Sequence, residues 1–92
     1  MTEETQHHSH KDVVNRLKRA NGHLRSIIDM IDNQRPRVEI AQQLHAVEKA
    51  VTQAKKTLIH DHLEHCLADA LDRPEKATRE TLEEFTRISR YL

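Results

Sequence analysis

The fold is decided by residues 13–31, which read VVNRLKRANGHLRSIIDMI. Apolar side chains recur there at alternating spacings of four and three residues, which places them on one face of an α-helix. This heptad pattern predicts a helix that packs along a second helix. The six positions of the repeat are Val13, Leu17, Ala20, Leu24, Ile27 and Ile31.

A second helix with the same spacing is predicted from about Pro36 to about Leu71. Pro36 suits the first turn of a helix, where its missing N–H costs nothing. The segment Asp72-Arg73-Pro74 is expected to end this helix. Its apolar positions are Ile40, Leu44, Val47, Val51, Ala54, Leu58, Leu63, Leu67 and Leu71.

A third helix is predicted to start around residues 75–78 and to direct Leu82, Phe85, Ile88 and Leu92 inward. The first two helices share a seam and the second is much longer, which predicts an all-α antiparallel hairpin with an overhang. A second protomer is the natural cover for that overhang. We expect one domain over residues 11–92, preceded by a disordered, His-rich arm at residues 1–10.

Composition supports an oligomer. The chain has 92 residues and only two aromatic side chains, so a lone protomer has little large apolar surface to bury. The net charge is zero, but residues 11–56 carry ten Lys or Arg against five acids, and residues 57–92 carry five against eight. A basic half suits an anionic partner. Charge alone favours the simpler interpretation of two solvated helix surfaces.

Several classes of protein are disfavoured. The single cysteine excludes an internal disulfide. The N-terminus does not read as a signal peptide, and no apolar run has transmembrane length, so we expect a cytoplasmic protein with no membrane partner. No nucleophile elbow, phosphate-binding glycine loop or catalytic triad is present, so we expect no enzyme. A Cys–His nucleophile is disfavoured because the overhang has no pocket-forming loops.

His62 and Cys66 are four residues apart and therefore lie on one helix face. Imidazole and thiolate together suit Zn, Ni, Co or Cu(I). The alternative is an ordinary buried cysteine beside exposed histidines. Two ligands rarely suffice. His23 is a candidate third ligand. It follows Gly22, a mid-helix glycine that costs about 1 kcal/mol relative to alanine, so something should compensate, and a close helix approach near His23 is one possibility.

The remaining histidines are weaker candidates. A half-exposed His23 with no ligand role also remains open. His7, His8 and His10 can close over the site from the N-terminal arm, or they are incidental. His65 lies one residue off the face of His62 and Cys66. His60 lies on the far side, and His45 is interpreted as a packing or surface residue.

Two basic clusters can neutralise DNA phosphates. The sequence shows neither a helix-turn-helix signature nor an aromatic stacking platform, and taken alone it favours a solvated helix face. The first cluster lies on the first helix and the second on the second helix. They comprise Arg16, Lys18 and Arg19 with Arg25, and Lys49, Lys55 and Lys56.

Three segments resemble the CsoR/RcnR/FrmR family of metal-responsive transcriptional repressors: RLKRANGHLR at 16–25, IAQQLHAVEKA at 40–50 and DHLEHC at 61–66. The resemblance covers about residues 11–92 and is closest to the nickel- and copper-responsive branches. It implies a three-helix protomer, a dimer forming an antiparallel four-helix bundle, and a homotetramer as a dimer of dimers. It also implies a repressor that binds double-stranded operator DNA in the apo form. Inducer binding then releases the DNA and derepresses a metal efflux or detoxification gene.

The resemblance further implies a metal site shared by two protomers. Its histidine and cysteine fall on His62 and Cys66, and nickel-responsive members add a ligand matching His23 or, more loosely, the N-terminal histidines. A cysteine expected near the start of the second helix falls on Arg37, which cannot bind a metal because it keeps its proton. The loss of one thiolate favours Ni(II) or Co(II), with Zn(II) or Cu(I) possible. Formaldehyde and persulfide sensing, which need that cysteine, are disfavoured.

Two rival hypotheses remain open. In the first, the repressor has lost metal sensing through Arg37, which pairs with Glu39 or another acid, and it binds DNA constitutively or answers another signal. In the second, the chain is a metal-buffering helical protein without a DNA role.

Overall fold

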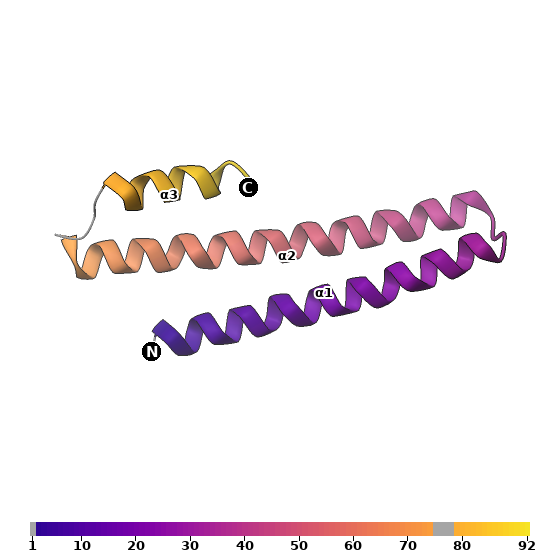
Figure 1. Cartoon of the computed structure of the whole chain (residues 1–92), viewed down its shortest axis with the longest axis horizontal. Coiled ribbons are helices and arrows are strands. Elements are labelled where there is room, and N and C mark those ends of the chain that lie inside the picture. Colours follow the sequence, from indigo (N-terminus) through magenta and orange to yellow (C-terminus); the bar gives the residue numbers. More distant parts are fainter. Residues whose placement is uncertain (1, 75–78) are drawn as a thin grey trace.

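The computed structural model describes residues 2–74 and 79–92, and it describes side chains over residues 10–74 and 79–92. Three helices follow one another: α1 (Thr2–Asp32), α2 (Arg37–Asp72) and α3 (Arg79–Ser89). Figure 1 shows α1 and α2 as an antiparallel hairpin, with α3 folded back along the C-terminal part of α2 on the side away from α1. The predicted all-α protomer with a long second helix is confirmed. The predicted start of the third helix, residues 75–78, lies outside the described residues.

The first helix begins earlier than predicted. Its first residue is Thr2 rather than a residue near Lys11, so α1 has 31 residues against 36 in α2 and the overhang is shorter than expected. Residues 2–10 contain no Gly or Pro, and Glu3 and Glu4 stabilise a helix N-terminus through the helix dipole. The division into an N-terminal arm and a domain from residue 11 stays a prediction.

The predicted seam is buried at every second position. Within the described part of the chain, the buried α1 residues are Val13, Ala20 and Ile27, at a spacing of seven, and Val47 and Ala54 oppose them from α2. The intervening seam residues remain exposed, so one protomer covers only half of the predicted seam. Two antiparallel helices contact each other along a single line. This line is narrower than the two rows of apolar side chains in a heptad repeat, so only one row is buried.

The uncovered half of the seam forms an apolar face on one side of the hairpin. Its residues follow the buried positions by four residues in both helices, which places the two rows on the same side. The protomer measures 60 × 26 × 14 Å, with a radius of gyration of 18.1 Å, against about 13 Å for a compact chain of about 100 residues. We call Leu17, Leu24, Ile31, Leu44, Val51 and Leu58 the apolar face.

The short loop between α1 and α2 ends at Pro36, so the predicted start of the second helix at about Pro36 is confirmed. The backbone N–H groups of Gln34 and Arg35 donate to the carbonyls of Ile31 and Met30 at 3.1 and 3.0 Å. Gln34 has a φ of 55°, a left-handed conformation that favours glycine or asparagine. Pro36 stands immediately before the first residue of α2, where its fixed φ suits the helix start.

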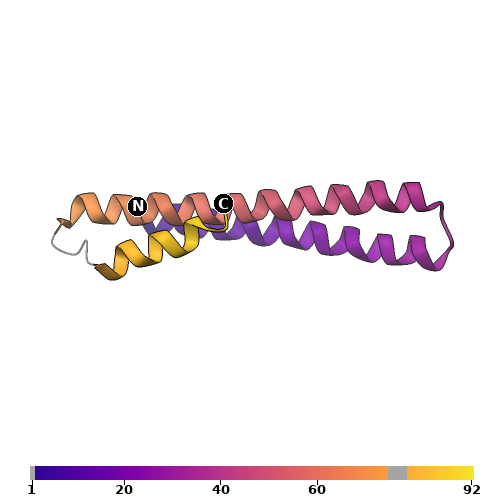
Figure 2. The same cartoon turned by 90° about the horizontal axis from the view of Figure 1, so that it is seen from above.

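Figure 2 shows from above that α3 runs back along the C-terminal part of α2. This packing is looser than that of the hairpin, because no residue of α3 is fully buried. Phe85 and Ile88 are half-buried. The prediction that Leu82 and Leu92 point inward is wrong, because they are 64% and 65% exposed. A single helix of 11 residues covers too little of α2 to bury four apolar positions. None of the described helices is long and apolar enough to cross a membrane.

Candidate functional site

His62 and Cys66 lie side by side on α2, near its C-terminal end. The imidazole Nε2 of His62 is 3.6 Å from the Sγ of Cys66, as the four-residue spacing predicts. The same Nε2 is 3.1 Å from Oε1 of Glu84, which α3 supplies. The cysteine is half-buried rather than a fully buried core residue. An imidazole, a thiol and a carboxylate therefore meet where α3 packs on α2.

The thiol of Cys66 favours its protonated form. Burial raises the pKa of this thiol above its ordinary value, and the carboxylates of Glu84 and Asp69 raise the pKa further. Both effects oppose a negative charge on sulfur. A bound cation would act in the opposite sense, because it stabilises the thiolate and offsets the neighbouring carboxylates.

The described part of one protomer does not bring together a full set of metal ligands. Among the described side chains, no three His, Cys, Asp or Glu residues are arranged to hold an ion. His23 is hydrogen-bonded to Gln43 across the hairpin. Gln43 precedes His62 by 19 residues, which is about 28 Å along a helix. His23 and His62 of the same chain are therefore far apart, and any joint site needs a second copy.

Arg37 is also remote from His62 of its own chain. It is exposed at the first residue of α2 and lines a surface cavity of about 490 Å³ at the hairpin tip, together with Ile31, Gln34, Arg35 and Ile40. The hypothesis that Arg37 pairs with Glu39 is wrong. Arg35 bonds that carboxylate instead, with Nη2 2.8 Å from Oε2, because the i,i+4 spacing puts both side chains on one face.

The remaining histidines fall into three groups. The side chains of His7 and His8 lie outside the described residues, and His10 is exposed. His45 and His60 are exposed beside Glu48 and Glu64, at 4.0 and 3.6 Å, which places His45 on the surface. His65 is half-buried, and its Nδ1 has no hydrogen-bond partner within the described part of the chain. A buried nitrogen left unpaired costs about 1–3 kcal/mol, so a further group from outside would be stabilising.

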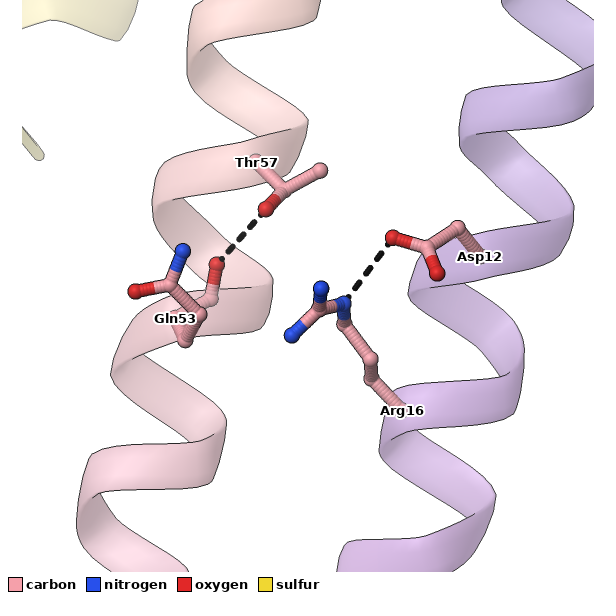
Figure 3. Close-up of polar contacts among 4 residues, drawn as sticks. All are labelled: Asp12, Arg16, Gln53 and Thr57. Carbon is pink, nitrogen blue, oxygen red and sulfur yellow. Dashed lines mark hydrogen bonds and ion pairs between the residues drawn. The ribbon is translucent and has the colours of Figure 1, made fainter.

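The basic residues of α1 differ in how they are held. The Nε of Arg16 donates to Asp12 at 2.9 Å, and Figure 3 shows this guanidinium directed toward α2 between the helices. Arg16 also lines a small cavity of about 190 Å³ with Arg19, Ala20, His23 and Ala50.

The other predicted DNA-binding residues are exposed. They make no ion pair with a described side chain, so their charges are available to a partner. Lys56 in addition lines a surface cavity of about 490 Å³ that includes Gln53, His60 and Leu92. These exposed residues are Lys18, Arg19, Arg25, Lys49, Lys55 and Lys56.

No close helix approach occurs at Gly22. A Cβ added there would meet no atom of the described chain within 4 Å, so this prediction is wrong for the protomer. The residue lies on the outer side of α1, between the buried positions Ala20 and Ile27 in sequence but not on their face.

Sequence reasoning missed Glu84. Its carboxylate reaches His62 from 22 residues further along the chain, and no local spacing rule links positions on two different helices. The available signal was the acidic composition of the third helix, where Glu80, Glu83 and Glu84 cluster. That composition does not show which of the three faces His62.

Comparison with known proteins identifies the family. Residues 9–90 match the family model described as a metal-sensitive transcriptional repressor. The chain belongs to this family. The copper-sensing transcriptional repressor CsoR of Bacillus subtilis (strain 168) is 38% identical over 80 residues, which cover 85% of this chain and 79% of that protein. CsoR of Mycobacterium ulcerans (strain Agy99) is 40% identical over 58 residues, or 63% of this chain and 50% of that protein.

A solved structure agrees with this membership. The nickel-responsive transcriptional regulator InrS has a TM-score of 0.77 at 30% identity, covering 89% of this chain and 91% of that chain. The chain is therefore a metal-sensing transcriptional repressor and not an enzyme. Repression implies binding to operator DNA, so the hypothesis of a metal-buffering protein without a DNA role does not fit.

Proposed function

We propose that this repressor binds double-stranded operator DNA in its apo form and releases it when Ni(II) or Co(II) binds at His62 and Cys66. Release would allow expression of a metal efflux or detoxification gene. The observation that carries the proposal is the His62–Cys66 pair, whose Nε2 and Sγ are 3.6 Å apart. Both atoms belong to ligand types that borderline metal ions prefer.

The apolar face supports an oligomer. Its six large side chains would be exposed in a monomer, and a second copy packed face to face would bury them. Two antiparallel hairpins joined in this way make a four-helix bundle. We propose this bundle as the dimer and a dimer of dimers as the complete repressor. An antiparallel partner also carries the start of one α2 toward the end of the other, so donors remote in one protomer can meet.

The donor chemistry supports Ni(II) or Co(II) over Cu(I). The relatives differ in their metals: the Bacillus protein is named for copper and InrS for nickel. Here Cys66 is the single cysteine, whereas Cu(I) prefers soft sulfur ligands. Arg37 supplies a cation in place of a ligand. We propose His23 or an N-terminal histidine (His7, His8 or His10) as further donors, with His65 less favoured and Zn(II) or Cu(I) as alternative ions.

The contact between α2 and α3 suggests how the ligand changes the protein. The Nε2 of His62 cannot remain hydrogen-bonded to Glu84 while it coordinates an ion, so metal binding would break this bond between α2 and α3. Cys66 would also give up its proton, which makes binding weaker at acid pH. A coupling free energy of only about 1–3 kcal/mol between this event and the DNA-binding surface would change operator occupancy strongly.

Fluorescence anisotropy tests the proposal directly. The apo protein should bind a labelled G/C-rich inverted repeat at about 0.2 M salt, and Ni(II) or Co(II) should release it. His62→Ala should keep apo DNA binding and lose the response to metal. The matched control is His45→Ala, an exposed histidine on the same helix, which should respond as the wild type does.

Each other outcome is informative. A His62→Ala protein that still releases DNA with metal would place the site elsewhere. Wild-type binding that ignores Ni(II), Co(II), Zn(II) and Cu(I) alike would favour a repressor in which Arg37 has abolished metal sensing. No binding by the apo protein would contradict the proposed mode of repression.

A further inference from the structure

Gly22 stands on an open helix surface. It is the only glycine of the chain, it is exposed, and a Cβ at this position would contact no atom of the described residues. Glycine destabilises a helix interior relative to alanine because its backbone loses more conformational freedom on folding. Packing within the protomer offers no compensation for that loss. A group that needs the space left by the missing side chain must therefore come from outside the protomer.

The side chains around Gly22 indicate the charge of that partner. Lys18 precedes Gly22 by four residues and Arg25 follows it by three, so all three lie on one helix face. Arg19 flanks the same surface one turn earlier. The cations Lys18, Arg19 and Arg25 are exposed, and none of them forms an ion pair with a described side chain. Arg16 differs, because Asp12 holds it and its guanidinium points toward α2 (Figure 3).

We propose that the sugar-phosphate backbone of double-stranded DNA approaches α1 most closely at Gly22, between Lys18 and Arg25. The missing side chain lets the DNA backbone lie against the helix, and the two cations neutralise phosphates on either side of that point. Their Cα atoms are seven residues apart, about 10 Å along the helix. This inference rests on the proposed function and names the surface that performs it.

A second copy of the chain is the other possible occupant, and the charges oppose it. In an isologous contact centred on Gly22, Lys18 and Arg25 of one copy would face the same cations of the other. Like charges brought together in this way repel. The apolar face, which includes Leu17 and Leu24, lies on a different side of α1 and suits a second copy better.

The test uses a labelled mixed-sequence DNA duplex at about 50 mM salt, because phosphate contacts do not depend on base sequence. Gly22→Ala should raise the thermal unfolding midpoint by several degrees, since alanine favours helix. The same variant should bind the duplex about tenfold more weakly, and Gly22→Leu should bind more weakly still. A substitution that stabilises the fold while weakening DNA binding is not expected of a merely structural residue.

Charge variants test the flanking contacts. Lys18→Gln and Arg25→Gln should each lower the slope of log affinity against log salt by about one. The control Arg73→Gln removes an exposed cation at the far end of α2 and should leave the slope unchanged. Asp29→Asn removes an acid from the Gly22 face, two turns beyond Gly22, and should strengthen binding.

The outcomes separate this inference from the proposed function. If the wild type fails to bind the duplex, the result contradicts both the proposed function and the Gly22 inference. If the wild type binds and Gly22→Ala binds equally well, only the Gly22 surface is overturned. If Gly22→Ala changes the sedimenting mass of the protein, the position faces a second copy and the inference is overturned.

Discussion

The two ends of α2 are packed differently. From residue 40 to residue 58 the helix lies against α1, with Val47 and Ala54 buried at a spacing of seven. Beyond that stretch Ile59 is also buried, and α3 adds half-buried Phe85 and Ile88 and a polar bond from Glu84 to His62. The first region is held by apolar side chains at a regular spacing, whereas the second combines apolar contacts with a polar bond between α2 and α3. The difference suggests that the hairpin supplies most of the stability, and the metal response that we propose lies at the α2–α3 end.

The largest expected effect is in the hairpin seam. Ile27 is 2% exposed, so Ile27→Ala should lower the free energy of unfolding by about 2–5 kcal/mol through the cavity it leaves. Urea denaturation of the apo protein measures this loss. Ile88→Ala, in half-buried α3, is the comparison and should cost clearly less. An equal loss at both positions would remove the distinction between the two regions.

A smaller effect is expected on the apolar face. Leu24 is 39% exposed in the protomer, so burial of the remaining surface against a second copy would contribute about 0.6–1.2 kcal/mol per leucine. Leu24→Gln should therefore shift the oligomer toward monomers in sedimentation velocity at micromolar concentration. Leu82→Gln, an exposed leucine on α3, is the matched variant. Unchanged mass for Leu24→Gln would show that this face does not join the copies.

A smaller effect again is expected at the α2–α3 end. Glu84→Gln removes a carboxylate that raises the pKa of Cys66, so the thiol pKa should fall, but it should stay above its ordinary value because burial is the larger cause. The rate of alkylation of the apo protein against pH measures this pKa. Asp69→Asn should shift the pKa in the same direction but less. A rise in the pKa in Glu84→Gln would contradict the placement of Glu84 beside Cys66.

The smallest effect is expected in the α1–α2 loop. Gln34 adopts a φ of 55°, which is unfavourable for a residue with a Cβ and favourable for glycine. Gln34→Gly should raise the free energy of unfolding by up to about 1 kcal/mol. Thermal unfolding with and without Ni(II) would show whether the gain belongs to the hairpin alone. A loss of stability would mean that Gln34 makes a contact the protomer does not contain.

Sequence spacing predicted most of the hairpin and half of the candidate site. The heptads located both long helices, and the His62–Cys66 spacing placed two donors on one face because helical geometry is local. The spacing failed where the answer depends on packing. It could not tell that Leu17 and Leu24 stay exposed while Ala20 is buried, or that Leu82 points outward. It also assigned Gly22 a helix neighbour that the protomer does not have.

The sequence by itself determined the helices, the loop at Pro36, the adjacent His62–Cys66 pair and the basic character of α1, because each depends on residues within a few positions of one another. Tertiary structure alone decided which seam rows are covered, that Glu84 rather than Glu80 or Glu83 bonds His62, and that His23 lies opposite Gln43. These contacts join residues about 20 positions or more apart. Their geometry depends on how two helix surfaces fit together, and no local spacing rule encodes that fit.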